Sequence, residues 1–100
     1  ALRHATDDPA TWANRGAAHL KLGAPTAALQ DARVARALDP TYVKAWYREG
    51  LAAQALELWE DAAQAFYEAF QLDPDQPQFA QRFHQAIKSG REAHAAAQKG

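Results

Sequence analysis

Two cationic side chains lie four residues apart in the stretch Lys44-Ala45-Trp46-Tyr47-Arg48. On a helix, positions i and i+4 share one face, so both charged groups would point the same way. A planar guanidinium can bind a carboxylate through two parallel hydrogen bonds, and an ammonium adds a point charge. Lys44 and Arg48 therefore predict a surface that binds a carboxylate. A plain solvated helix face is the alternative interpretation.

The remaining reactive side chains form no pattern typical of a metal site or a catalytic site. The chain has four histidines and no cysteine, and no two histidines have the spacing of a His-x-x-x-His metal-binding pair. Ser89 is the only serine, so a nucleophile with an adjacent base is not evident. We therefore expect no enzyme activity, no metal and no cofactor.

Composition argues against two further classes of partner. The 11 basic and 12 acidic side chains leave a formal net charge of −1, whereas a nucleic-acid-binding domain usually carries a basic face. No apolar stretch approaches the roughly 18 residues of a membrane span. We expect neither nucleic acid nor membrane as a partner, and the absence of cysteine fits a reducing compartment.

The sequence repeats itself at a spacing of 34 residues. The matches with most weight are Trp12 with Trp46, Gly16 with Gly50, and Asp39-Pro40 with Asp73-Pro74. A short unit of this kind cannot bury its own apolar face, so each unit must stack on its neighbour. The same spacing brings Asn14, Arg48 and Arg82 to one position in successive units, as a row across helices about 8–10 Å apart.

Proline, glycine and aspartate mark where helices should begin and end. Alanine is abundant and β-branched residues are scarce, which favours helix throughout. We expect helices over 9–22, 25–38, 42–56 and 59–72, because Pro suits a first helical turn and Gly23 suits a helix end. A last helix should begin near 77 and bury one stripe, with Gly90 weakening it and the residues from His94 fraying. This divides the chain into 1–6, the end of a preceding helix, then two units over 9–40 and 43–74, and a capping helix over 77–97.

Small and large residues alternate in a way that predicts how the helices pack. Six small residues recur where the two helices of one unit should approach closely, with a backbone-to-backbone contact expected at Gly50. Large side chains should fill the wider gaps: Trp12, Leu38, Trp46, Phe66 and Leu72. On the last helix, the stripe facing the preceding helix should be Phe79, Phe83 and Ile87.

Together these residues resemble the tetratricopeptide repeat (TPR) family, whose 34-residue unit uses Trp, Gly, Ala, an aromatic, Ala and Pro at set positions. The second unit matches that pattern through Trp46, Gly50, Ala62, Phe66, Ala69 and Pro74. The first unit matches it through Trp12, Gly16, Ala28, Ala35 and Pro40. The resemblance implies an all-α, helix-turn-helix solenoid of two full repeats and a C-terminal capping helix.

A narrower resemblance concerns the charged residues. Asn14-Arg15 after Trp12, and the stretch Lys44 to Arg48, look like repeats two and three of a carboxylate-clamp TPR domain. That resemblance implies a co-chaperone that binds the acidic C-terminal tails of cytosolic heat-shock chaperones, and so a cytoplasmic protein. Asn14 would be the clamp residue of the second repeat, and Lys44 and Arg48 those of the third. The Lys and Asn of the first repeat have no counterpart, so at most three of five clamp residues are present.

Several alternatives stay open at the level of sequence. Tyr47 and Arg82 are further candidates for the peptide-binding groove, and Leu20 and Leu51 are candidates, with Tyr47, for an apolar spot on its concave face. Core packing for the three apolar residues and plain surface for the arginine fit equally well. A generic TPR scaffold with a different protein partner is the alternative function. The start at Ala1, without Met, favours a piece cut from a longer protein. Self-association of such an incomplete array remains open.

Overall fold

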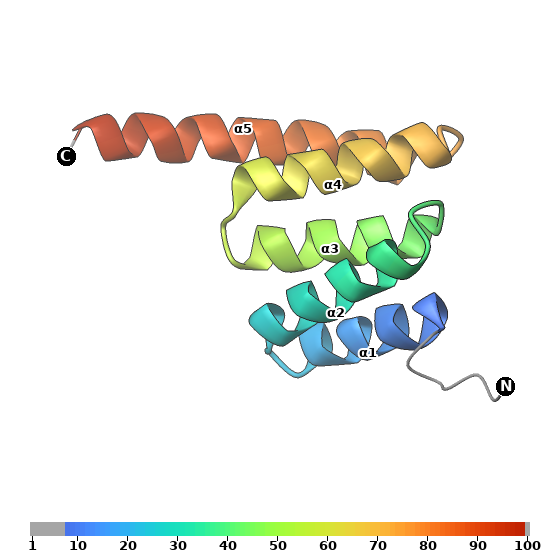
Figure 1. Cartoon of the computed structure of the whole chain (residues 1–100). Helices are drawn as coiled ribbons and strands as arrows, with labels where there is room; N and C mark the ends of the chain where they lie inside the picture. The colour runs from blue at the N-terminus through green and yellow to red at the C-terminus, as the bar shows by residue number, and fades with distance from the viewer. Residues whose placement is uncertain (1–7, 100) are drawn as a thin grey trace, which may run out of the picture.

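The computed structural model describes residues 8–99. It contains five helices and, within that range, no strand: α1 (Pro9–Lys21), α2 (Pro25–Leu38), α3 (Val43–Ala55), α4 (Trp59–Leu72) and α5 (Pro77–Lys99). The helices stack in chain order as an open array, and α5 runs well past the end of α4 (Figure 1). The helix end expected in residues 1–6 lies outside the described residues. None of the described helices is long and apolar enough to cross a membrane.

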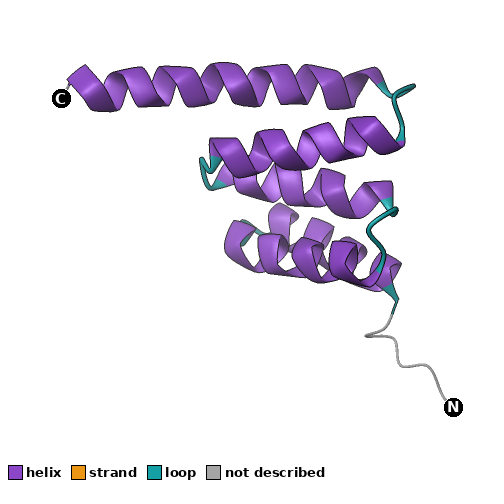
Figure 2. Ribbon diagram, turned by 45° about the horizontal axis from the view of Figure 1, so that its top comes forward, coloured by secondary structure: helices purple, strands orange, loops and turns teal. Residues whose placement is uncertain are grey.

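The helix bounds follow the local signals closely. The Asp8 side chain accepts a hydrogen bond from the backbone N–H of Ala10 at 3.1 Å, which caps α1. Gly23, with φ +75°, ends that helix in the left-handed conformation that glycine adopts at little cost. Short loops then return each helix antiparallel to the one before it, so that the chain consists of helices joined by tight connections (Figure 2).

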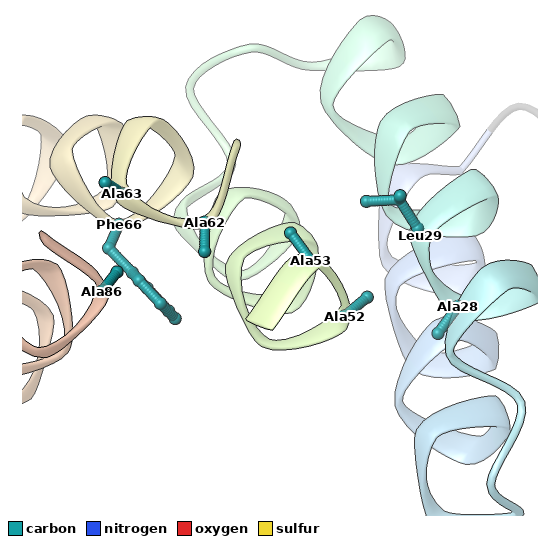
Figure 3. Close-up of a cluster of buried hydrophobic side chains, with 8 residues drawn as sticks. All are labelled: Ala28, Leu29, Ala52, Ala53, Ala62, Ala63, Phe66 and Ala86. Carbon is teal, nitrogen blue, oxygen red and sulfur yellow. The ribbon is translucent and has the colours of Figure 1, made fainter. Parts of the chain in front are cut away.

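The core is built mainly from alanine around one large ring. Phe66 is fully buried, and the surrounding cluster draws on four helices (Figure 3): Ala28, Leu29, Ala52, Ala53, Ala62, Ala63 and Ala86. Because alanine side chains are short, the helices can approach closely, and the one phenyl ring fills the space left between α3 and α4. This confirms that Phe66 fills a gap and that the small residues Ala28 and Ala62 are buried between helices.

Two expectations about packing are wrong. A Cβ placed on Gly50 would lie 2.5 Å from the ring of Phe66, so that glycine makes room for a side chain and not for a backbone. The close backbone approach is at Gly16, whose Cβ would lie 3.2 Å from the carbonyl oxygen of Ala28. Leu38 and Leu72 are not enclosed in a gap between helices: 43% and 38% of their surface is exposed, and each is the last residue of its helix.

The last helix also differs from expectation at its C-terminal end. It continues through Gly90 to Lys99, since alanine-rich segments favour helix. Gly90 has a packing role, since a Cβ there would lie 3.0 Å from the Cβ of Trp59 at the start of α4. Of the predicted stripe, Phe79 is buried, and Phe83 and Ile87 are partly buried against the core cluster.

Candidate functional site

A cavity of about 330 Å³ opens at the N-terminal end of α3, and three of the predicted site residues line it. Lys44, Tyr47 and Arg48 contribute one wall, because residues three and four apart share a helix face. The turn after α4 and the first residues of α5 complete the lining together with the start of α3: Val43, Asp73, Gln76, Gln78 and Phe79. The cavity thus lies between the N-terminal ends of α3 and α5.

Tyr47 holds this site together. Its ring packs against Phe66 and Phe79, with ring centres 6.0 and 5.3 Å apart. The guanidinium carbons of Arg48 and Arg82 lie 5.8 and 5.7 Å from the centre of the same ring. Both are within range of a cation–π interaction, so a side chain anchored on the core positions one cation from α3 and another from α5.

The structure brings together four of the five predicted residues. Lys44, Tyr47, Arg48 and Arg82 gather around one ring and one cavity, with Arg82 beside the cavity and not among its lining residues. Asn14 is exposed on α1 and does not line the cavity. Leu20 and Leu51, two further apolar candidates, pack against the core cluster.

The cations at this site differ from Arg15, Arg33 and Arg36, which form ion pairs. Arg15 pairs with Asp31 at 3.4 Å, and Arg33 pairs with Glu49 at 3.4 Å. Within residues 8–99, the structure shows no carboxylate within 4.0 Å of Lys44, Arg48 or Arg82. Their charges are therefore available to an anionic ligand, and Asp73 is the acidic group in the cavity lining.

A buried carboxylate of α3 faces α2. Glu49 is 5% exposed and forms ion pairs with Arg33 and Arg36 of α2. Burial raises the pKa of the Glu49 carboxyl, and the charges of Arg36 and then Arg33 oppose that rise. Arg36 also stacks on the Trp46 ring at 4.7 Å. This network ties α3 to α2.

Sequence reasoning missed the far side of the cavity and the buried network. Asp73 and Gln76 belong to the turn after α4, and Gln78 lies in the first turn of α5; the sequence marked this turn with Asp73-Pro74 but did not show which helix it faces. Glu49 occupies the repeat position of Arg15, so the 34-residue comparison gave no sign of a paired, buried acid there. A group of three His, Asp or Glu side chains placed to hold a metal is absent from the described part of the chain.

Known proteins share both sequence and fold with this chain. No family model matches it. Hsp70-Hsp90 organizing protein 2 of Arabidopsis thaliana is 32% identical over 82 residues, and the chain spans 14% of that protein's length. Among solved structures, the Arabidopsis OM64 TPR domain is 30% identical with a TM-score of 0.78, over 82% of this chain and 68% of that one. The first TPR of Spaghetti (RPAP3), bound to the HSP90 peptide SRMEEVD, is 26% identical with a TM-score of 0.80, over 83% of this chain and 66% of that one.

Five helices in an open array, a 34-residue repeat and this degree of similarity define the class of protein: a helical-repeat domain resembling those of co-chaperones. The chain belongs to the tetratricopeptide repeat family.

Proposed function

We propose that this chain is a protein-interaction module that binds acidic C-terminal peptides of heat-shock chaperones, with no catalytic activity of its own. The observation that carries the proposal is the pair Lys44 and Arg48, which line one cavity and have no carboxylate within 4.0 Å among the described residues. The HSP90 peptide bound by the first TPR of Spaghetti ends in Glu-Glu-Val-Asp. We propose the same kind of ligand for this chain, and the cytoplasm as its location.

The chemistry of the site suits such a ligand. A C-terminal Asp offers two carboxylates close together, one on the main chain and one on the side chain. Arg48 can hold one of them bidentately, and Lys44, one turn away on α3, can neutralise the other. Asn14 would donate from its amide to the peptide further along the groove, outside the cavity. We further propose that residues 9–40 and 43–74 act as two repeats, and 77–97 as the cap.

Replacing Arg48 by Ala tests the proposal. A hydrogen bond to a charged group contributes roughly 1.5–3 kcal/mol net. Arg48→Ala should therefore weaken the binding of the peptide SRMEEVD by about 10- to 150-fold. Amidating the C-terminus of the peptide should weaken binding to the unmodified chain in the same way. Isothermal titration calorimetry measures both effects, and raised salt should reduce the affinity of the unmodified chain more than that of the variant.

Arg91→Ala is the matched control. It removes the same charge from α5, but Arg91 lines a different cavity, next to Trp59. Equal binding of the free-acid and amidated peptides, or unchanged binding by Arg48→Ala, would contradict the proposal.

A generic TPR scaffold is the second candidate function. It is favoured by the position of Asn14, which is exposed and outside the cavity, so the residues of the proposed clamp do not all meet in one place. In that case the same titrations would show no dependence on a free C-terminal carboxylate.

A further inference from the structure

We infer that Arg82 is a specificity-determining residue that binds a second acidic side chain of the peptide, two residues before its C-terminal residue. This deepens the proposed function and rests on it, because Lys44 and Arg48 are taken to hold the C-terminal residue. The ligand would then be a peptide with acids at alternate positions, and not merely one with a free carboxyl end.

The first support is the distance between the two arginines. The guanidinium carbons of Arg48 and Arg82 lie 5.8 and 5.7 Å from the centre of the Tyr47 ring, so they cannot be further apart than the sum of these distances. In an extended peptide, side chains two residues apart point to the same face and are separated by about 6.6 Å. A peptide whose last residue contacts Arg48 can therefore present that second side chain to Arg82.

The second support is that Arg82 stands beside the cavity and not in it. Lys44 and Arg48 line the cavity, whereas Arg82 reaches the Tyr47 ring from α5 without joining the lining. It therefore provides a point of contact outside the cavity lining, on the side of Tyr47 that faces α5.

The third support is that the charge of Arg82 is not neutralised by an acid of the described residues. Arg82 is half-buried, and no acidic side chain within the described range pairs with it, in contrast to Arg15, Arg33 and Arg36. Two arginines on one ring repel each other, and an acidic ligand between them relieves that repulsion. Tyr47 is itself packed on Phe66 and Phe79, so both guanidinium groups are positioned before a ligand arrives.

A double-mutant cycle tests this inference. Arg82→Gln is titrated with SRMEEVD, with the same peptide carrying Gln for the Glu two residues before the end, and with Gln for the Glu three residues before the end. We expect Arg82→Gln to weaken the original peptide about fivefold. It should weaken the first Gln peptide less than twofold, and the second Gln peptide as much as the original. Arg91→Gln, which removes the same charge from α5 outside this groove, should change none of the three affinities.

The possible results separate the inference from the proposed function. If Arg82→Gln weakens all three peptides equally, or none, while Arg48→Ala still removes the preference for a free C-terminus, the inference is wrong and the proposed function stands. If the unmodified chain does not bind SRMEEVD, or binds its amidated form as tightly, both are wrong. Unchanged thermal unfolding of Arg82→Gln and Arg91→Gln, followed by circular dichroism, shows that the fold is intact in both variants.

Discussion

At the scale of single residues, the proposed site contains one acid among its cations. Asp73 lines the same cavity as Lys44 and Arg48 but forms no ion pair within 4.0 Å and no side-chain hydrogen bond with other described residues. Its repeat equivalent, Asp39, accepts hydrogen bonds from the backbone and hydroxyl of Thr41, at 3.0 and 2.7 Å. The two aspartates occupy the same repeat position after a helix, but Asp39 hydrogen-bonds within its turn and Asp73 lines the cavity.

Replacing Asp73 by Asn should tighten the binding of an acidic peptide. A negative charge facing the ligand opposes binding, and its removal should increase affinity by about two- to fivefold at low salt, the range of a partly exposed charge interaction. Fluorescence anisotropy of a labelled SRMEEVD peptide measures the change. Asp75→Asn makes the same change of net charge in the same turn, outside the cavity lining, and should have little effect. A loss of affinity in Asp73→Asn would show that the carboxylate supports the site.

At the scale of elements, the turn between α1 and α2 and the turn between α3 and α4 both contain a residue in the left-handed conformation, but the residue types differ. Gly23 follows α1 with φ +75°, and Glu57, at the equivalent position after α3, has φ +59°. A left-handed conformation costs a residue with a side chain roughly 1–2 kcal/mol, because its Cβ crowds the following carbonyl oxygen, whereas glycine has no Cβ. The second turn is therefore strained where the first is not.

Glu57→Gly should stabilise the protein by roughly 0.5–1 kcal/mol. The gain is the relief of that strain, reduced by the greater freedom that glycine has in the unfolded chain. Urea unfolding followed by circular dichroism measures it. Gly23→Ala is the reciprocal change and should destabilise, although a Cβ there meets no atom within 4 Å, so the cost is conformational. A Glu57→Gly variant less stable than the original chain would mean that the glutamate side chain makes a compensating contribution.

At the scale of the whole molecule, one buried acid connects three helices. Glu49 of α3 pairs with Arg33 and Arg36 of α2, and Arg33 also lies 3.7 Å from Asp61 of α4. Because burial raises the pKa of Glu49 above its ordinary value of 4.5, the folded state binds this proton more tightly than the unfolded state does. The contribution of Glu49 to stability is therefore full below pH 4.5 and is lost as the pH rises through the raised pKa.

Glu49→Gln, which mimics the protonated side chain, should gain stability relative to the unmodified chain as the pH rises from about 4 to 7. Each unit by which the pKa is raised corresponds to about 1.4 kcal/mol. Thermal unfolding of both proteins across that range gives the difference, and other acids cancel because both chains carry them. A variant that loses relative stability with rising pH would show that attraction to Arg33 and Arg36 outweighs the cost of burial.

The sequence alone determined the helices and their order. Proline and aspartate at helix starts, Gly23 at a helix end and the 34-residue repeat act locally or through fixed spacing, so the helix bounds could be read within a residue or two. The same spacing indicated that Lys44 and Arg48 share a face. At Gly50 the sequence correctly indicated that space is limited. It did not show that the space is taken by the ring of Phe66 and not by a backbone.

Only the tertiary structure decided which side chains meet. Tyr47 contacts Phe66, Phe79 and Arg82, which are 19 or more positions away in the chain, and such contacts depend on how α4 and α5 pack. It was also packing that placed Asp73 in the cavity, left Asn14 outside it, and gave Glu49 its partners. A repeat period predicts that equivalent positions lie on equivalent helices. Whether two side chains touch depends on the volumes between those helices, and these follow from all the residues that fill them.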